Sequence, residues 1–97
     1  MLLAWFDASE AKNFGASLAN FYIERLPPNT PGQKNTTKKE QEVLNRMFQQ
    51  IGQFKLKNKL NIYKKAQLGN TFKWELRNAG YNTAFIDALT TQLMIAL

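Results

Sequence analysis

The sequence predicts an all-α fold in which a compact array of four to five helices forms a single domain over residues 1–97. Apolar residues recur at spacings of three and four along most of the chain, and capping residues precede several of these stretches. No stretch shows the bounded, β-branched alternation that a strand needs. A chain of 97 residues is also the size of one domain with one hydrophobic core.

The first helix is expected to run from Asp7 to about Leu26. Asp7 and Glu10 have the spacing of a capping box, and Phe6 stands where a hydrophobic staple would lie. The apolar residues of this helix follow at spacings of three and four: Ala11, Phe14, Leu18 and Phe21. Gly15 weakens the helix locally, and we expect its small size to let a neighbouring segment approach.

A loop is expected over residues 27–36, between the first and second helices, because three prolines lie there. The second helix is expected to begin at Thr37, with Glu40 at the spacing of a capping box. Its apolar stripe is the clearest in the chain: Val43, Leu44, Met47, Phe48 and Ile51.

The apolar pattern turns to a different side of the helix after Gly52. The next apolar positions still have helical spacing but form a rotated stripe: Leu56, Leu60 and Tyr63. We therefore expect a kink, a break or a change of packing partner between Gly52 and Lys55. A second weak point is Gly69, where the helix either continues or restarts with Asn70 or Thr71 as its cap.

The end of the chain carries signals for a helix end followed by a new start. One face before this point is apolar, with Trp74 off it: Leu68, Phe72, Leu76 and Ala79. Gly80 follows as a C′ residue, with Tyr81 at the apolar position of a Schellman motif. The last helix is expected to start at Asn82 or Thr83 and to run to the end. Its main stripe is Phe85, Ala88, Leu89 and Leu93, and Ile86, Met94, Ile95 and Leu97 extend its apolar character around the helix.

The composition excludes most catalytic chemistries. The chain has no Cys and no His, which removes thiolate metal sites, disulfides, Ser–His triads and the commonest general base. The acids Asp7, Glu10 and Glu40 stand at expected helix starts, where capping and the helix dipole explain them. The five glycines are scattered and form no phosphate-binding loop. We predict that the protein is not an enzyme and uses no cofactor and no metal ion.

The first residues of the chain predict its location. Residues 1–6 are apolar, but six residues without a basic flank are too few for a signal peptide or a membrane span. A cytoplasmic location is therefore expected.

The net charge of +6 arises within residues 53–77, which hold seven cations and one acid. The cations are Lys55, Lys57, Lys59, Lys64, Lys65, Lys73 and Arg77. Clustered cations attract phosphates, and aromatic rings among them can stack on bases, so this segment is a candidate site for a polyanion such as nucleic acid. Two alternatives stand beside this hypothesis: the lysines are solvated flanks of a core helix, or the segment lies on an anionic membrane surface.

Both ends of the chain are more apolar than free ends usually are. The residues concerned are Leu2, Leu3, Trp5, Phe6, Leu93, Met94, Ile95 and Leu97. Either they belong to the core of the single chain, or they form an interface with a second copy or another protein. The main prediction is therefore a non-enzymatic helical interaction protein, a homo-oligomer or a small partner-binding subunit. Nucleic-acid association through residues 53–77 is the first alternative, and membrane-surface binding is the second.

Overall fold

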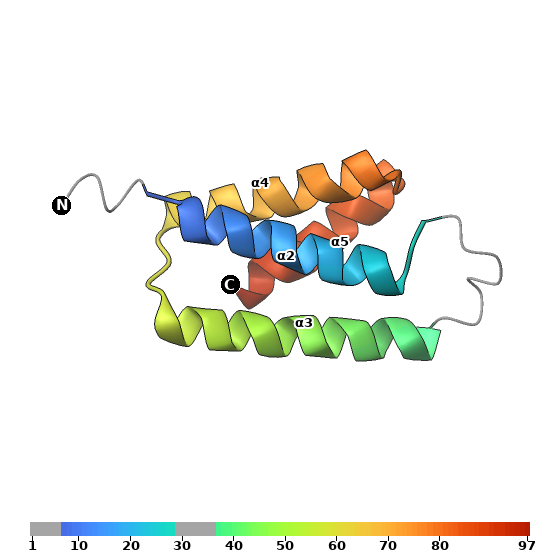
Figure 1. Ribbon diagram of the computed structural model, residues 1–97, viewed down its shortest axis with the longest axis horizontal. Helices are drawn as coiled ribbons and strands as arrows, with labels where there is room; N and C mark the ends of the chain where they lie inside the picture. Colours follow the sequence, from blue (N-terminus) through green and yellow to red (C-terminus); the bar gives the residue numbers. More distant parts are fainter. Residues whose placement is uncertain (1–6, 29–36) are drawn as a thin grey trace.

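In the computed structural model, residues 7–28 and 37–97 are described, and they contain four helices (Figure 1). They are α2 (Ser9–Arg25), α3 (Thr37–Lys57), α4 (Ile62–Ala79) and α5 (Thr83–Ala96). No strand occurs within these described ranges. The prediction of an all-α fold with four to five helices is confirmed, with four helices in one compact globule.

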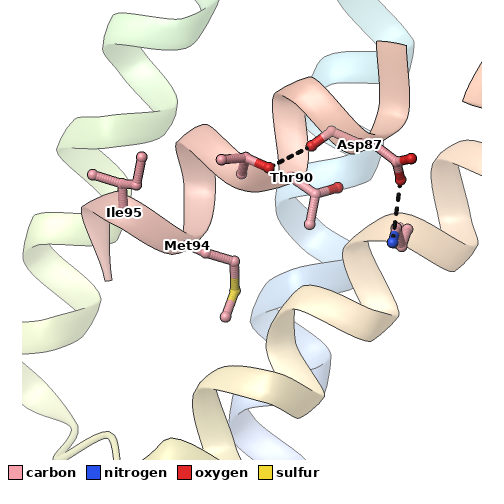
Figure 2. A pocket seen from close by; sticks show the side chains of 6 residues that line it. Asp87, Thr90, Met94 and Ile95 are labelled. Carbon is pink, nitrogen blue, oxygen red and sulfur yellow. Dashed lines mark hydrogen bonds and ion pairs between the residues drawn. The ribbon is translucent and has the colours of Figure 1, made fainter. Parts of the chain in front are cut away.

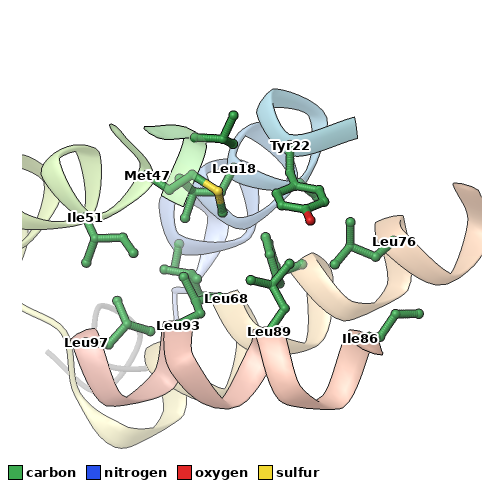
Figure 3. Packing of buried hydrophobic residues seen from close by; sticks show 14 of the residues in the cluster. Leu18, Tyr22, Met47, Ile51, Leu68, Leu76, Ile86, Leu89, Leu93 and Leu97 are labelled. Atoms are coloured by element: carbon green, nitrogen blue, oxygen red, sulfur yellow. The ribbon is translucent and has the colours of Figure 1, made fainter. Parts of the chain in front are cut away.

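The helices surround one hydrophobic core. α2 packs mainly on α4, α5 packs on α4, and α3 makes smaller contacts with α2 and α5. Figure 1 shows α3 and α4 on opposite sides of the molecule, with α2 between them in this view. Figure 3 shows the packed side chains, of which the largest fully buried ones are Phe72, Leu18, Met47, Ile51, Leu68, Leu76 and Leu93. No polar or charged residue among the described ones is buried, so burial of apolar area holds the fold together.

α2 begins one step later than the capping-box prediction required. Ala8 occupies the N-cap position, so the capping-box register of Asp7 with Glu10 is wrong, although Asp7 does accept from a first-turn N–H. Asp7 lies just outside the helix, where its Oδ1 accepts hydrogen bonds from the Ser9 backbone nitrogen at 3.1 Å and the Ser9 hydroxyl at 2.8 Å. These bonds lower the pKa of the Asp7 carboxyl, and an aspartate can satisfy a first-turn N–H from this position. Phe6 lies outside the described residues.

Two glycines bring the helices close together. A Cβ at Gly15 on α2 would lie 2.5 Å from the carbonyl oxygen of Leu68 on α4, so α2 approaches the α4 backbone at this point. A Cβ at Gly69 would lie 2.7 Å from the Met94 Sδ on α5. The expectation that Gly15 admits a close neighbour is confirmed. α4 runs unbroken through Gly69, which settles the alternative that the sequence left open.

Of the three alternatives expected between Gly52 and Lys55, the break is wrong, whereas the kink and the change of packing partner stay predictions. α3 continues through Gly52, which is exposed and has nothing within 4 Å of a Cβ built there. The chain breaks after Lys57 instead, where the Asn58 side chain donates to the Phe54 carbonyl oxygen at 3.1 Å. The rotated helical stripe is also wrong, because Leu56 is 86% exposed, Leu60 lies between helices and Tyr63 belongs to α4. An exposed glycine costs a helix only about 1 kcal/mol, which is too little to end it.

Asparagine side chains start the last two helices. Asn61 caps α4 by accepting from the Lys64 backbone nitrogen at 2.8 Å. Asn82 caps α5 by accepting from the backbone nitrogens of Ala84 at 2.8 Å and Phe85 at 3.3 Å. The second cap confirms the expected start of the last helix. The predicted capping box of α3 involves the Thr37 side chain, which lies outside the described part.

The expected C-terminal motif of α4 is present. Gly80 has φ 101°, its backbone nitrogen donates to the Arg77 carbonyl oxygen, and the Tyr81 nitrogen donates to the Leu76 carbonyl oxygen. These are the two hydrogen bonds of a Schellman motif. The Tyr81 hydroxyl donates to the Leu26 carbonyl oxygen, which ties the α4–α5 turn to the end of α2. Burial raises the pKa of Tyr81 to about 12.

Searching the described residues finds no helix with the length and apolar character needed to cross a bilayer.

Candidate functional site

The structure divides the predicted terminal interface. Leu93 and Leu97 lie in the core of the single chain, so they are not surface residues as the interface prediction required (Figure 3). Met94 is 38% exposed and Ile95 is 81% exposed on the same helix. Four further members lie outside the described residues: Leu2, Leu3, Trp5 and Phe6. Of the described members, Met94 and Ile95 are therefore the ones that a partner can reach.

A shallow groove separates α4 from α5 beside these two residues (Figure 2). Met94 points across it toward α4, where the missing side chain of Gly69 makes room for its sulfur. At the other end of the groove, the Lys73 ammonium of α4 pairs with the Asp87 carboxylate of α5 at 3.2 Å. The Thr90 hydroxyl, which also lines the groove, is buried and has no hydrogen-bond partner among the described residues. One end of the groove is therefore lined by the apolar side chains of Met94 and Ile95, and the other end by the Lys73–Asp87 ion pair.

The side of α5 that faces away from the core carries an exposed stripe. Its residues have spacings of four, three and four: Ala84, Ala88, Thr91 and Ile95. We call this stripe the α5 outer face. Its spacing is that of one seam of a helix pair, and its members are small except for Ile95. The only charged residue of α5 is Asp87, whereas α2, α3 and α4 all carry cations.

The cations of residues 53–77 do not form one surface. The Lys55 ammonium donates to the Ala96 carbonyl oxygen at 3.1 Å, so it binds the C-terminus of α5, where a cation is favoured by the helix dipole. Lys57 and Lys59 are exposed where α3 ends and the chain turns. Lys64 and Lys65 are half-buried in the first turn of α4.

Lys73 and Arg77 lie further along α4, next to the exposed Trp74. They share a shallow depression whose lining residues come from α4 and, for Lys12, from α2: Lys12, Gln67, Asn70, Thr71, Lys73, Trp74 and Arg77. We call this surface the Trp74 face. Lys12 was missed by the sequence analysis, because it lies more than sixty residues from Arg77 in the chain and only helix packing unites them. The signal in the sequence that could have indicated this surface is Trp74, which lies off the apolar stripe of its helix.

Side-chain chemistry suited to catalysis is scarce in the described ranges. No three acidic residues among them gather closely enough to hold a metal ion. Burial raises the pKa values of Tyr22 and Tyr81, and the nearby Glu40 carboxylate adds to the effect on Tyr22, so these hydroxyls keep their protons near neutral pH. The surfaces just described present exposed apolar side chains and cations.

Compared with protein-family models, curated proteins and solved structures, the chain shows no significant match.

Proposed function

We propose that the protein is a non-enzymatic helical module that associates with a second copy of itself through the α5 outer face. The observation that carries the proposal is Ile95, which is 81% exposed at one end of an otherwise small-residue stripe. The aliphatic side chain of Ile95 and the small side chains beside it leave apolar surface in water that a second copy can bury.

The shape of the stripe favours an antiparallel pair of α5 helices. In that arrangement Ile95 of each chain lies opposite Ala84 of the other, so a bulky side chain meets a position with room for it. Ala88 and Thr91 lie at the middle, where small side chains allow the two backbones to approach closely. The face is therefore complementary to its own two-fold copy.

The distribution of charge favours the same arrangement. A chain of net charge +6 repels its own copy, and the repulsion is strongest where the cations lie. Of the four described helices, α5 is the one that carries no cation of its own, and the two lysines that border it are held by the Ala96 carbonyl oxygen and the Asp87 carboxylate. Asp87 at the edge of the face is already paired with Lys73.

The small size of the face limits the affinity. α5 has 14 residues and is about 21 Å long, which suits an interface at the low end of the size range. We expect a reversible dimer with a Kd of roughly 1–100 μM. Sedimentation velocity across a concentration series measures it directly.

Matched pairs of variants test where the contact lies. Ile95→Glu should give a monomer, whereas Leu56→Glu makes the same change at an equally exposed residue of α3 and should leave the dimer intact. Ala88→Glu should dissociate it too, and Ala66→Glu on the exposed side of α4 should not. A wild-type protein that stays monomeric throughout the series, or equal effects within either pair, would refute the proposal.

A further inference from the structure

Trp74 is the largest apolar side chain that the described fold leaves in water. It is 60% exposed on α4, whereas Phe72 and Leu76, two residues away on either side, are buried in the core. Residues two apart on a helix point to different sides, so Trp74 projects away from the bundle. The Trp74 ring is not part of the core, so the residues around it on the surface indicate which kind of ligand it can contact.

The neighbours of Trp74 are cationic and amide side chains. The Arg77 guanidinium carbon lies 5.8 Å from the centre of the Trp74 ring, and the residues lining the same depression include Asn70, Lys12 and Lys73. No carboxylate belongs to this lining. A planar aromatic ring beside a planar guanidinium, with further cations around both, is an arrangement that suits bases and phosphates.

The cations of this face are largely free to bind an anion. Lys73 is paired with the exposed Asp87 carboxylate at 3.2 Å. Lys12 and Arg77 take part in no ion pair among the described residues. Lys12 on α2 and Arg77 on α4 can therefore each bind a phosphate and release the counterion that the phosphate held.

We propose that the Trp74 face binds a single-stranded nucleic acid, with a base stacked on the Trp74 ring and phosphates next to Lys12, Lys73 and Arg77. A single strand is favoured over a duplex because the bases of a duplex are already stacked and cannot cover a projecting indole. The amide side chains of Gln67 and Asn70 lie about two turns and about one turn before Trp74, within the same depression, and can hydrogen-bond to base edges.

The assay follows Trp74 directly. The chain has two tryptophans, so Trp5→Phe leaves Trp74 as the single fluorescent reporter. Titration with a single-stranded oligothymidylate should quench this fluorescence. Trp74→Leu should weaken binding of the labelled strand, measured by fluorescence anisotropy, roughly five- to 150-fold. Ile62→Ala changes another exposed apolar residue of α4 outside the face and should leave the affinity unchanged.

Salt dependence tests the phosphate contacts. Arg77→Gln and Lys12→Gln should each lower the slope of log K against log salt by about 0.7, the value for one phosphate of a single strand. Lys57→Gln removes an exposed cation at the end of α3 and should not change it.

The proposal would be overturned by no binding at low salt, by binding that Trp74→Leu leaves intact, or by equal losses from Lys57→Gln and Arg77→Gln. Inorganic polyphosphate or phosphatidylserine vesicles that displace the strand equally well from wild type and Trp74→Leu would also overturn it, since attraction would then depend on charge alone.

Discussion

Replacing Gly15 by alanine tests the close contact between α2 and α4. The added Cβ would lie 2.5 Å from the carbonyl oxygen of Leu68 and 3.3 Å from its carbonyl carbon. Both neighbours are backbone atoms, so no side chain can turn away to relieve the overlap. α2 and α4 must instead separate by about 0.5–1 Å, which forfeits a quarter to a half of each affected van der Waals contact.

The cost can be worked from this separation. Overpacking a core costs about 1–3 kcal/mol, and overlap with backbone belongs at the upper end of that range. Alanine recovers about 1 kcal/mol of helix propensity relative to glycine. Gly15→Ala should therefore lower the free energy of unfolding by about 1–2 kcal/mol, or Tm by about 4–16 °C for a domain of this size.

The other helical glycines provide internal controls for the same chemical change. A Cβ at Gly52 meets nothing within 4 Å, so Gly52→Ala should raise the free energy of unfolding by about 0.5–1 kcal/mol. A Cβ at Gly69 meets the flexible end of Met94 at 2.7 Å, and Gly69→Ala should fall between the other two. Urea unfolding followed by circular dichroism measures all three. A Gly15→Ala protein as stable as wild type would refute the close approach, and a destabilised Gly52→Ala protein would refute the continuous α3.

Three further predictions concern the core, a cap and the buried tyrosines. Phe72→Ala should lower the free energy of unfolding by about 3–5 kcal/mol in the same urea experiment, and a loss below about 1 kcal/mol would contradict its central place in the core. Asn82→Ala should cost about 1 kcal/mol through loss of the α5 cap, whereas Asn78→Ala on the exposed side of α4 should cost nothing. The folded protein holds the protons of Tyr22 and Tyr81 beyond the ordinary tyrosine pKa of 10, so this contribution to stability is full below pH 10 and declines as pH rises toward 12. Urea midpoints that do not fall through this alkaline range would contradict it.

Residues close together in the chain were largely predictable. Gly80 and Asn82 lie within three residues of each other, and each acts on backbone groups at most five residues away, so their roles follow from local geometry. The stripe of α3 was predicted in part, because Val43, Met47 and Ile51 are buried whereas Phe48 is 37% exposed. The helix start near Asp7 was predicted one residue too early, because an aspartate that precedes the N-cap residue has almost the same sequence signature as one at the N-cap position.

The interruptions of the helices were harder to predict. Gly52 and Gly69 carry the same propensity penalty, yet neither breaks its helix. At Gly69 the helix is stabilised by packing, because the small residue leaves room for the Met94 side chain. At Gly52 the loss of helix propensity is too small to end the helix by itself. The break after Lys57 depends on Asn58 and Asn61, and their significance becomes visible only when the partner of each helix is known.

The sequence by itself determined the all-α class, the starts of the second and last helices and the end of α4, because spacing and capping act over a few residues. It also excluded histidine and cysteine chemistry, since composition needs no structure. Only the tertiary structure decided which apolar residues of α5 became core and which stayed exposed. α5 is apolar on several sides, and the number of neighbouring helices sets how much of it is covered: Leu93 and Leu97 are buried, whereas Ile95 between them faces water. Packing of α2 on α4 likewise brought Lys12 to Trp74, a pairing that no local pattern encodes.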